Sequence, residues 1–114
     1  MPKCLFCSIS SGEIPATIVY QDTDLLAFED IAPQAPVHLL IIPRKHLPTL
    51  NELTSADHLL VGKMLSLAKD LAAKNGLAER GYRAVFNCNR DACQSVFHIH
   101  LHLLGGRTFG WPPG

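Results

Sequence analysis

Short apolar segments, rich in β-branched or aromatic residues and mostly bounded by Gly, Pro, Asp or Asn, recur along the chain and predict β-strands. We expect five of them, at residues 17–20, 25–29, 37–42, 82–87 and 97–104. Between the third and the fourth, apolar residues from Leu59 to Leu71 recur at helical spacing, behind an N-cap at Thr54 and before a stop at Asn75. This pattern predicts one long amphipathic helix over 54–75, and a shorter helix is expected over 4–11.

The order of these elements is typical of an α+β fold. Strands with hairpin-length links come first, the long helix follows, and two strands close the pattern. This order favours an antiparallel sheet covered on one face over a parallel, doubly wound sheet. At 114 residues the chain has room for one domain, which we expect to span 1–114.

The composition excludes some classes of function. Ten Lys and Arg balance ten Asp and Glu, so the chain lacks the basic excess of a protein that grips a nucleic-acid backbone. No apolar run approaches the roughly 20 residues of a membrane span, and the first residues lack the apolar core of a signal peptide. We therefore expect a cytoplasmic protein without nucleic-acid or membrane partners, whose four cysteines serve metal binding, packing or reactivity.

Histidines are concentrated in the segment 98–104, which reads HIHLHLL. On a strand, His98, His100 and His102 share one face because side chains alternate between faces. Next-but-one residues lie roughly 6.6 Å apart, so adjacent imidazoles reach one small anion or serve two different sites. A solvated polar face of an edge strand is the alternative. This alternative does not explain why half of the six histidines fall within five residues. Histidine, with an unperturbed pKa near 6.5, is suited to proton transfer at neutral pH.

Two further segments carry candidate chemistry. The polar loop at 87–95 is either a plain turn or a nest of backbone N–H groups that, with the Ser95 hydroxyl, binds phosphate oxygens. Cys4 and Cys7 have the C-x-x-C spacing of half a zinc site, of a redox pair or of two small core residues. Spacing alone does not decide among these three, although no strand precedes Cys4 as it would in a redox motif.

The pattern His-φ-His-φ-His-φ-φ, in which φ is apolar, is the signature of the histidine triad family, and the chain carries it at 98–104. The sequence resembles the branch of purine nucleoside phosphoramidases, the histidine triad nucleotide-binding proteins. Further matching segments span nearly the whole chain in order: 28–31, 33–38, 42–46, 94–96, 104–107 and 111–114. The resemblance implies a five-stranded antiparallel sheet with two helices, and a homodimer in which the two sheets are continuous.

The resemblance also implies an activity, the hydrolysis of purine nucleoside 5′-phosphoramidates. His100 would attack the α-phosphorus and form a covalent nucleotidyl-histidine intermediate that water hydrolyses. His102 and His38 would hold phosphate oxygens or orient the site, and Ser95 would hydrogen-bond the leaving nitrogen or a phosphoryl oxygen. A dinucleoside polyphosphate hydrolase, or an adaptor that only senses purine nucleotides, would use the same residues; the ending 111–114 favours the phosphoramidase branch.

A nucleotide site follows from the same resemblance. It implies these roles: ribose binding for Asp30, a base pocket lined by Ile31 and Phe28, and a position near the phosphate for Asn87. The chain departs from the branch at 92–93, where Ala and Cys stand in place of two glycines. Because glycines let the backbone approach phosphate closely, the added Cβ atoms are expected to shift this loop or narrow the leaving-group side.

Some members of the family bind zinc through four side chains, and the matching residues are all present: Cys4, Cys7, His46 and His98. If the metal holds His98, it fixes the strand while the other two triad histidines stay free for chemistry, so the metal is structural. The alternative is a pair of cysteines that only pack.

Overall fold

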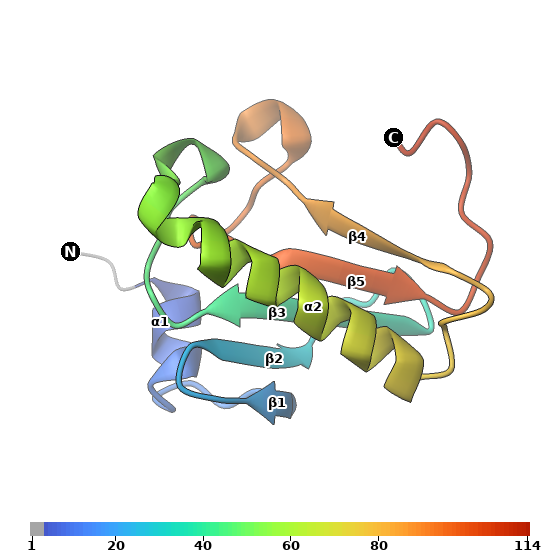
Figure 1. Cartoon of the computed structure of the whole chain (residues 1–114), viewed down its shortest axis with the longest axis horizontal. Coiled ribbons are helices and arrows are strands. Elements are labelled where there is room, and N and C mark those ends of the chain that lie inside the picture. Colours follow the sequence, from blue (N-terminus) through green and yellow to red (C-terminus); the bar gives the residue numbers. More distant parts are fainter. Residues whose placement is uncertain (1–3) are drawn as a thin grey trace.

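The computed structural model describes residues 4–114, in which five antiparallel strands form one sheet (Figure 1). In spatial order the strands are β1 (Ile18–Gln21), β2 (Leu25–Glu29), β3 (Val37–Pro43), β5 (Leu101–Gly105) and β4 (Tyr82–Phe86). Every neighbouring pair is antiparallel. The predicted α+β class and its antiparallel sheet are confirmed, and the first four strands lie within one residue of their predicted bounds.

The central strand β3 separates two apolar layers. Leu39 and Ile41 point to α2 (His58–Lys74), which crosses the front of the sheet in Figure 1, while Leu40 and Ile42 point to α1 (Leu5–Ser10) on the other face. The faces differ because strand side chains alternate, and all but the first residue of β3 are buried. Both faces of the sheet therefore carry a helix, where the sequence predicted cover on one face.

The long helix begins later than predicted. Thr54 caps a short 3₁₀ turn, η2 (Ser55–Asp57), through a capping box in which the Asp57 carboxylate accepts from the Thr54 backbone N–H. The carboxylate of Asp57 also accepts from Lys45 Nζ at 2.6 Å, which holds this turn against the loop after β3. The α-helical hydrogen bonds begin only at His58, and the helix ends, as predicted, with Asn75 as its C-cap. Two further 3₁₀ turns are η1 (Leu50–Glu52) and η3 (Arg90–Ala92).

The last strand also begins later, at Leu101 rather than at residue 97. Its ladder with β3 pairs Leu101 with Ile41, and in the same register Ile99 would face Pro43. Proline has no amide hydrogen and cannot continue the ladder. The backbone N–H of Ile99 donates instead to the carbonyl of Leu47 at 2.7 Å. The strand predicted over 97–104 therefore starts too early, and of the three histidines only His102 lies on β5. The three still share the α1 side, since His98 and His100 contact Phe6 and His102 lies opposite Leu40.

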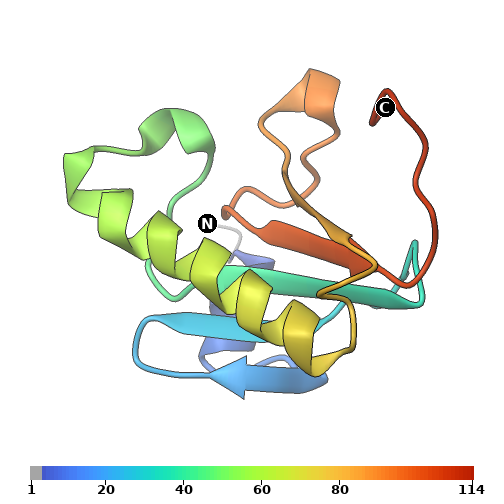
Figure 2. The same ribbon diagram turned by 45° about the vertical axis from the view of Figure 1, so that its right-hand side comes forward.

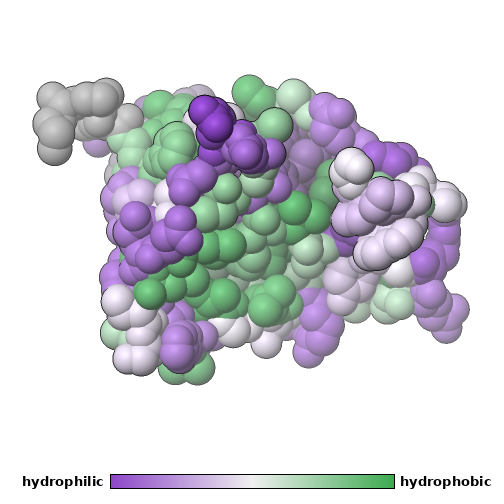
Figure 3. Space-filling view, turned by 90° about the horizontal axis from the view of Figure 1, so that it is seen from above, coloured by the Kyte–Doolittle hydropathy of each residue, from purple (hydrophilic) through white to green (hydrophobic). Residues whose placement is uncertain are grey.

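The edge formed by β4 is lined with apolar surface. Figure 3 looks onto this edge and shows hydrophobic residues gathered in the middle of the face. Tyr82 and Ala84 are exposed on β4, and Leu65 of α2 is 50% exposed. After β5 the chain turns back along the β4 side of the molecule, where its C-terminal end lies (Figure 2). Within residues 4–114, no helix is long and apolar enough to cross a membrane.

Candidate active site and metal centre

Two histidines from adjacent strands form a hydrogen-bonded pair on the α1 face of the sheet. His102 lies opposite Leu40, and His38 lies two residues before Leu40 on the same face. This register brings His38 Nε2 to 2.9 Å from His102 Nδ1. The backbone N–H of Gln34 donates to His38 Nδ1 at 3.0 Å, so a neutral His38 carries its proton on Nε2 and donates it to His102. The neutral His102 then carries its own proton on Nε2.

His100 completes this group from the segment just before β5. Its ring centroid is 4.9 Å from that of His102, and its Nδ1 lies 2.8 Å from the backbone carbonyl of His98. A carbonyl only accepts hydrogen bonds, so Nδ1 carries the proton and Nε2 presents a lone pair. Backbone groups thus fix the tautomers of the three histidines, which gives the site one nucleophilic nitrogen next to one N–H donor.

Burial keeps these imidazoles neutral. It lowers the pKa of His102 to about 4, with the neighbouring His100 and His38 adding to the effect and Asp30 opposing it. Burial also lowers the pKa of His100, against the stabilising hydrogen bond to His98, and it lowers the pKa of His38, against the charge of Asp30. At neutral pH His100 is therefore unprotonated at Nε2, the form that a nucleophile requires.

The other predicted ligands converge beside this group in a cluster that can hold a metal ion: Cys4, Cys7, His46 and His98. His98 Nδ1 lies 3.3 Å from Cys4 Sγ, 3.6 Å from Cys7 Sγ and 3.3 Å from His46 Nδ1. Cys7 Sγ and His46 Nδ1 are 3.4 Å apart. A tetrahedral zinc ion with bonds of about 2.0 Å to nitrogen and 2.3 Å to sulfur spaces such atoms roughly 3.3–3.8 Å apart, so the donor set fits.

The protonation of the cluster also suits a cation. His98 Nε2 donates to the Pro43 carbonyl at 2.7 Å, which leaves Nδ1 with a lone pair aimed at the cluster. Burial and the adjacent Cys4 thiol raise the pKa of Cys7, so two neighbouring thiolates need a cation between them. Asp30, His38 and His102 also lie close enough to share an ion. They fit one less well, because Gln34 makes His38 Nδ1 an acceptor and leaves the proton on Nε2, which faces the others.

Comparison with known proteins assigns the chain to a family. The HIT domain family matches residues 11–109 of the sequence. The chain belongs to the HIT family. Purine nucleoside phosphoramidase of Escherichia coli K12 is 48% identical over 108 residues, which are 95% of this chain and 91% of the relative. A HIT-like protein of Synechocystis is 52% identical over 110 residues, 96% of each chain. The crystal structure of a HIT family hydrolase from Legionella pneumophila superposes with a TM-score of 0.97 at 58% identity, covering 98% of this chain and 100% of that one.

In this HIT protein the residues predicted to bind nucleotide lie at different depths. The Asp30 carboxylate is 3.4 Å from His38 Nε2, at the edge of the histidine group. Ile31 is fully exposed and, with Asp30, lines a hollow of about 550 Å³ together with residues of the 15–17 segment. Phe28 is only 3% exposed and packs edge-on against Phe6 in the core, so its side chain lies beneath the surface rather than in the lining of that hollow.

The loop before the triad holds the remaining predicted residues. Ser95 is exposed and lines a hollow with Cys4, Cys7 and His46. Asn87 directly follows the end of β4. Within residues 4–114, no hydrogen bond joins the side chain of either residue to the triad. Cys93 adopts the left-handed conformation, with φ +61°, a backbone conformation that favours glycine. The HIT protein therefore keeps a glycine-like backbone at this point and strains a cysteine to do so.

Some functional contacts were not visible in the sequence. Phe6, between the two cysteines, packs edge-on against His100 at 5.0 Å between ring centroids. Gln94 is buried and ties the loop together, since its side chain bonds the backbone of Asn89, Pro48 and Val96. The sequence does show an amide residue, Gln94, directly before Ser95, and this is a signal that sequence reasoning could have used. The position of Phe6 had no signal, because it depends on how α1 docks.

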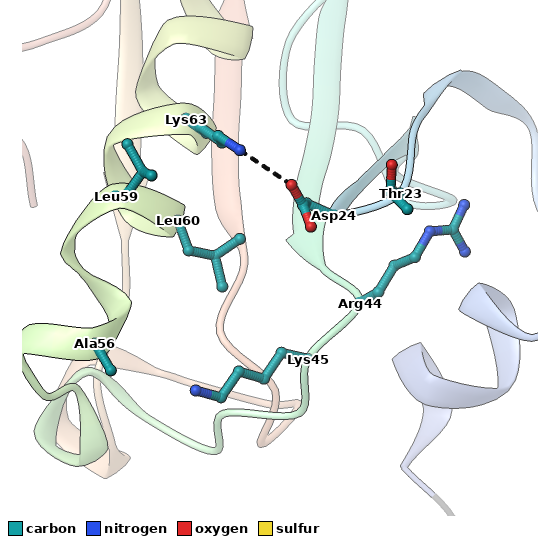
Figure 4. A pocket seen from close by; sticks show the side chains of 8 residues that line it. All are labelled: Thr23, Asp24, Arg44, Lys45, Ala56, Leu59, Leu60 and Lys63. Atoms are coloured by element: carbon teal, nitrogen blue, oxygen red, sulfur yellow. Dashed lines mark hydrogen bonds and ion pairs between the residues drawn. The ribbon is translucent and has the colours of Figure 1, made fainter.

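A separate pocket of about 430 Å³ lies between α2 and the ends of β2 and β3 (Figure 4). It is rich in cations, but each is already engaged. Lys63 pairs with Asp24 at 3.1 Å, Lys45 pairs with Asp57, and Arg44 points away to bond the backbone of Ser10. With its charges paired and no histidine or cysteine in its lining, this pocket is a poorer candidate for the chemistry than the histidine group.

Proposed function

We propose that this HIT protein hydrolyses purine nucleoside 5′-phosphoramidates through a covalent nucleotidyl intermediate on His100. The observation that carries the proposal is the hydrogen bond from His100 Nδ1 to the carbonyl of His98, which leaves Nε2 free, unprotonated and next to an N–H donor. The purine phosphoramidase of E. coli, 48% identical to this chain, supports the substrate class.

In the first step His100 Nε2 forms a bond to the α-phosphorus and the P–N bond breaks, its electron pair staying on the nitrogen. The amine leaves with a proton delivered from solvent through the exposed Ser95 hydroxyl. The attached imidazole now carries positive charge, which the carbonyl of His98 stabilises at Nδ1–H. The Nε2–H of His102, oriented by His38, donates to a phosphoryl oxygen as charge develops there.

In the second step a water molecule attacks phosphorus, the bond to His100 Nε2 breaks, and the water loses a proton to solvent. The electron pair of that bond returns to Nε2, so neutral His100 is restored and the nucleoside monophosphate is released. For substrate binding, we assign the ribose hydroxyls to Asp30, the base to Ile31 above the buried Phe28, and the phosphate region to Asn87. The hollow at Asp30 and Ile31 supports the placement of the nucleoside.

We further propose that the cluster of Cys4, Cys7, His46 and His98 binds zinc. The spacing of the four donor atoms supports this choice of metal. With four protein ligands, zinc supplies a structural crosslink and no open coordination position for substrate.

We also propose a homodimer in which β4 pairs with β4 of a second copy. An edge strand exposes unpaired backbone groups, and this one is flanked by apolar surface (Figure 3). Lys63, Ser66 and Asp70 of α2 face β1 and β2, so Leu65 lies on the flank toward β4. Replacing Leu65 by glutamate should shift the sedimentation coefficient from dimer to monomer; a wild-type monomer at micromolar concentration contradicts the proposal.

The activity is tested by AMP release from adenosine 5′-phosphoramidate. His100→Ala should reduce kcat/KM by at least about 1,000-fold, as loss of a nucleophile does in other covalent enzymes. His58→Ala is the matched control, because His58 is exposed at the start of α2. The proposal fails if His100→Ala keeps activity within about tenfold of wild type, or if wild-type protein does not release AMP.

A further inference from the structure

We propose that the metal centre positions the nucleophile, with His98 as the connecting residue: its side chain is a ligand and its backbone carbonyl orients His100. This inference rests on the proposed function, because it assigns a role to metal occupancy in that reaction. The metal would then do more than support the fold. Whether it is bound would set the orientation of the His100 imidazole, which it does not contact.

The sheet does not hold the backbone around His98. The ladders of β5 begin at Leu101, so the segment 97–100 lies outside them. The backbone bond that anchors it runs from the Ile99 N–H to the carbonyl of Leu47. Leu47 itself follows His46, a residue of the cluster. The backbone of His102 is held by the sheet, so the segment 97–100 must instead be held by contacts of its side chains.

His98 supplies these anchors through both of its ring nitrogens and its backbone carbonyl. Its Nε2 donates to Pro43, its Nδ1 points into the cluster, and its carbonyl accepts from His100. The residue is completely buried, so no water competes for these contacts. A bond from His98 Nδ1 to the metal fixes the imidazole ring of His98. Because the ring and the carbonyl share the same Cα, the bond also restrains the carbonyl oxygen that His100 contacts.

The cluster also confines His100 from the side of α1. α1 has only six residues, which is too short to be stable without tertiary support. Its N-cap, Cys4, and Cys7 within it both belong to the cluster, and Phe6 between them packs its ring edge-on against His100, with an interplanar angle of 87°. Release of the metal therefore loosens both the hydrogen bond that sets the tautomer of His100 and the ring that confines it.

The experiment compares the zinc-loaded protein with protein stripped by a chelator, at one pH and well below the melting temperature of either form. The ¹⁵N and ¹H signals of the histidine side chains report which nitrogen carries the proton. We expect His100 to show the Nδ1–H tautomer alone with Zn²⁺, averaged tautomers without it, and recovery when Zn²⁺ is returned. Cys7→Ser should reproduce the stripped state, because it removes a ligand that His100 does not contact.

Kinetics give a second readout. Metal removal should lower kcat by about 10–100-fold, the usual effect of losing a supporting contact around a reactive group, while KM for adenosine 5′-phosphoramidate changes less than about twofold. Leu71→Ala is the matched control for general loss of stability. Leu71 lies on the buried side of α2, which covers the face of the sheet opposite to the histidine group. The substitution should lower the melting temperature and leave the His100 signals unchanged.

The outcomes separate this inference from the proposed function. Unchanged His100 signals and unchanged kcat after metal removal overturn the inference, whereas phosphoramidate turnover then still stands. A protein that neither contains zinc nor takes it up from zinc chloride overturns it as well. If the His100 tautomer follows the metal but no phosphoramidate is cleaved, the positioning holds and the proposed function fails.

Discussion

Replacing His102 by asparagine should make the stability of the fold less dependent on pH. In the folded chain burial, followed by the neighbouring His100 and His38, lowers the pKa of His102 to about 4, and Asp30 opposes this shift. In the unfolded chain the pKa is about 6.5. Between these two values the unfolded chain binds a proton that the folded chain does not. The free energy of unfolding therefore rises with pH: this contribution is complete above pH 6.5 and is lost as the pH falls toward 4.

The magnitude follows from the separation of the two values. A pKa difference of this size corresponds to about 3 kcal/mol at most, since each unit is worth about 1.4 kcal/mol. The His102 side chain is partly exposed, and solvent screening reduces the expected contribution to about 2 kcal/mol. His102→Asn keeps an oxygen that can accept from His38 Nε2–H but does not titrate.

The assay is urea unfolding of both proteins at several pH values between 4.5 and 7. Protonation of the cysteine and histidine cluster is common to both and cancels in the difference. From pH 7 to pH 4.5 the wild type should lose about 2 kcal/mol more than His102→Asn. Equal losses, or a pKa of His102 near 6.5 in a side-chain NMR titration, would refute the claim that this ring is held neutral by its surroundings.

Three further predictions concern backbone positions. Cys93→Gly should relieve the left-handed strain and stabilise the fold by about 0.5–1 kcal/mol, measured by urea unfolding, whereas Ala92→Gly next to it should not stabilise; a destabilised Cys93→Gly would contradict this. Gly62→Ala in α2 meets no atom within 4 Å and should stabilise by about 1 kcal/mol. Gly105→Ala should destabilise by about 1–3 kcal/mol, because its Cβ would lie 2.5 Å from a methyl group of Leu77; equal effects of the two substitutions would show that this contact does not matter.

Local sequence signals were sufficient for most of the fold. The apolar runs and their turn residues located the strands, and helical periodicity located α2, because both signals are carried by residues close together in the chain. The start of β5 could not be found in this way. The alternation of His98, Ile99 and His100 looks like a strand, and what ends the ladder is Pro43 on the partner strand, which lies more than fifty residues earlier.

In the candidate site, too, the features carried by neighbouring residues could be predicted and those set by distant residues could not. The triad pattern and its resemblance to a family named the histidines that the structure brings together. Their tautomers depend on the N–H of Gln34 and on the carbonyls of Pro43 and His98, and no local pattern indicates which backbone atom meets which ring. The four donor atoms that could hold a metal ion come from three separate segments, so C-x-x-C spacing alone could not distinguish a metal site from packing cysteines.

The covalent intermediate is the most direct test of the account. Wild-type protein mixed with adenosine 5′-phosphoramidate should be denatured within the first turnover, kept at alkaline pH, digested and analysed by mass spectrometry. We expect one adenylyl group per chain, attached to the peptide that contains the triad and located by fragmentation to His100. An adduct on His102 or His38, or a burst of AMP with no adduct at all, would contradict the assignment of His100 as the nucleophile.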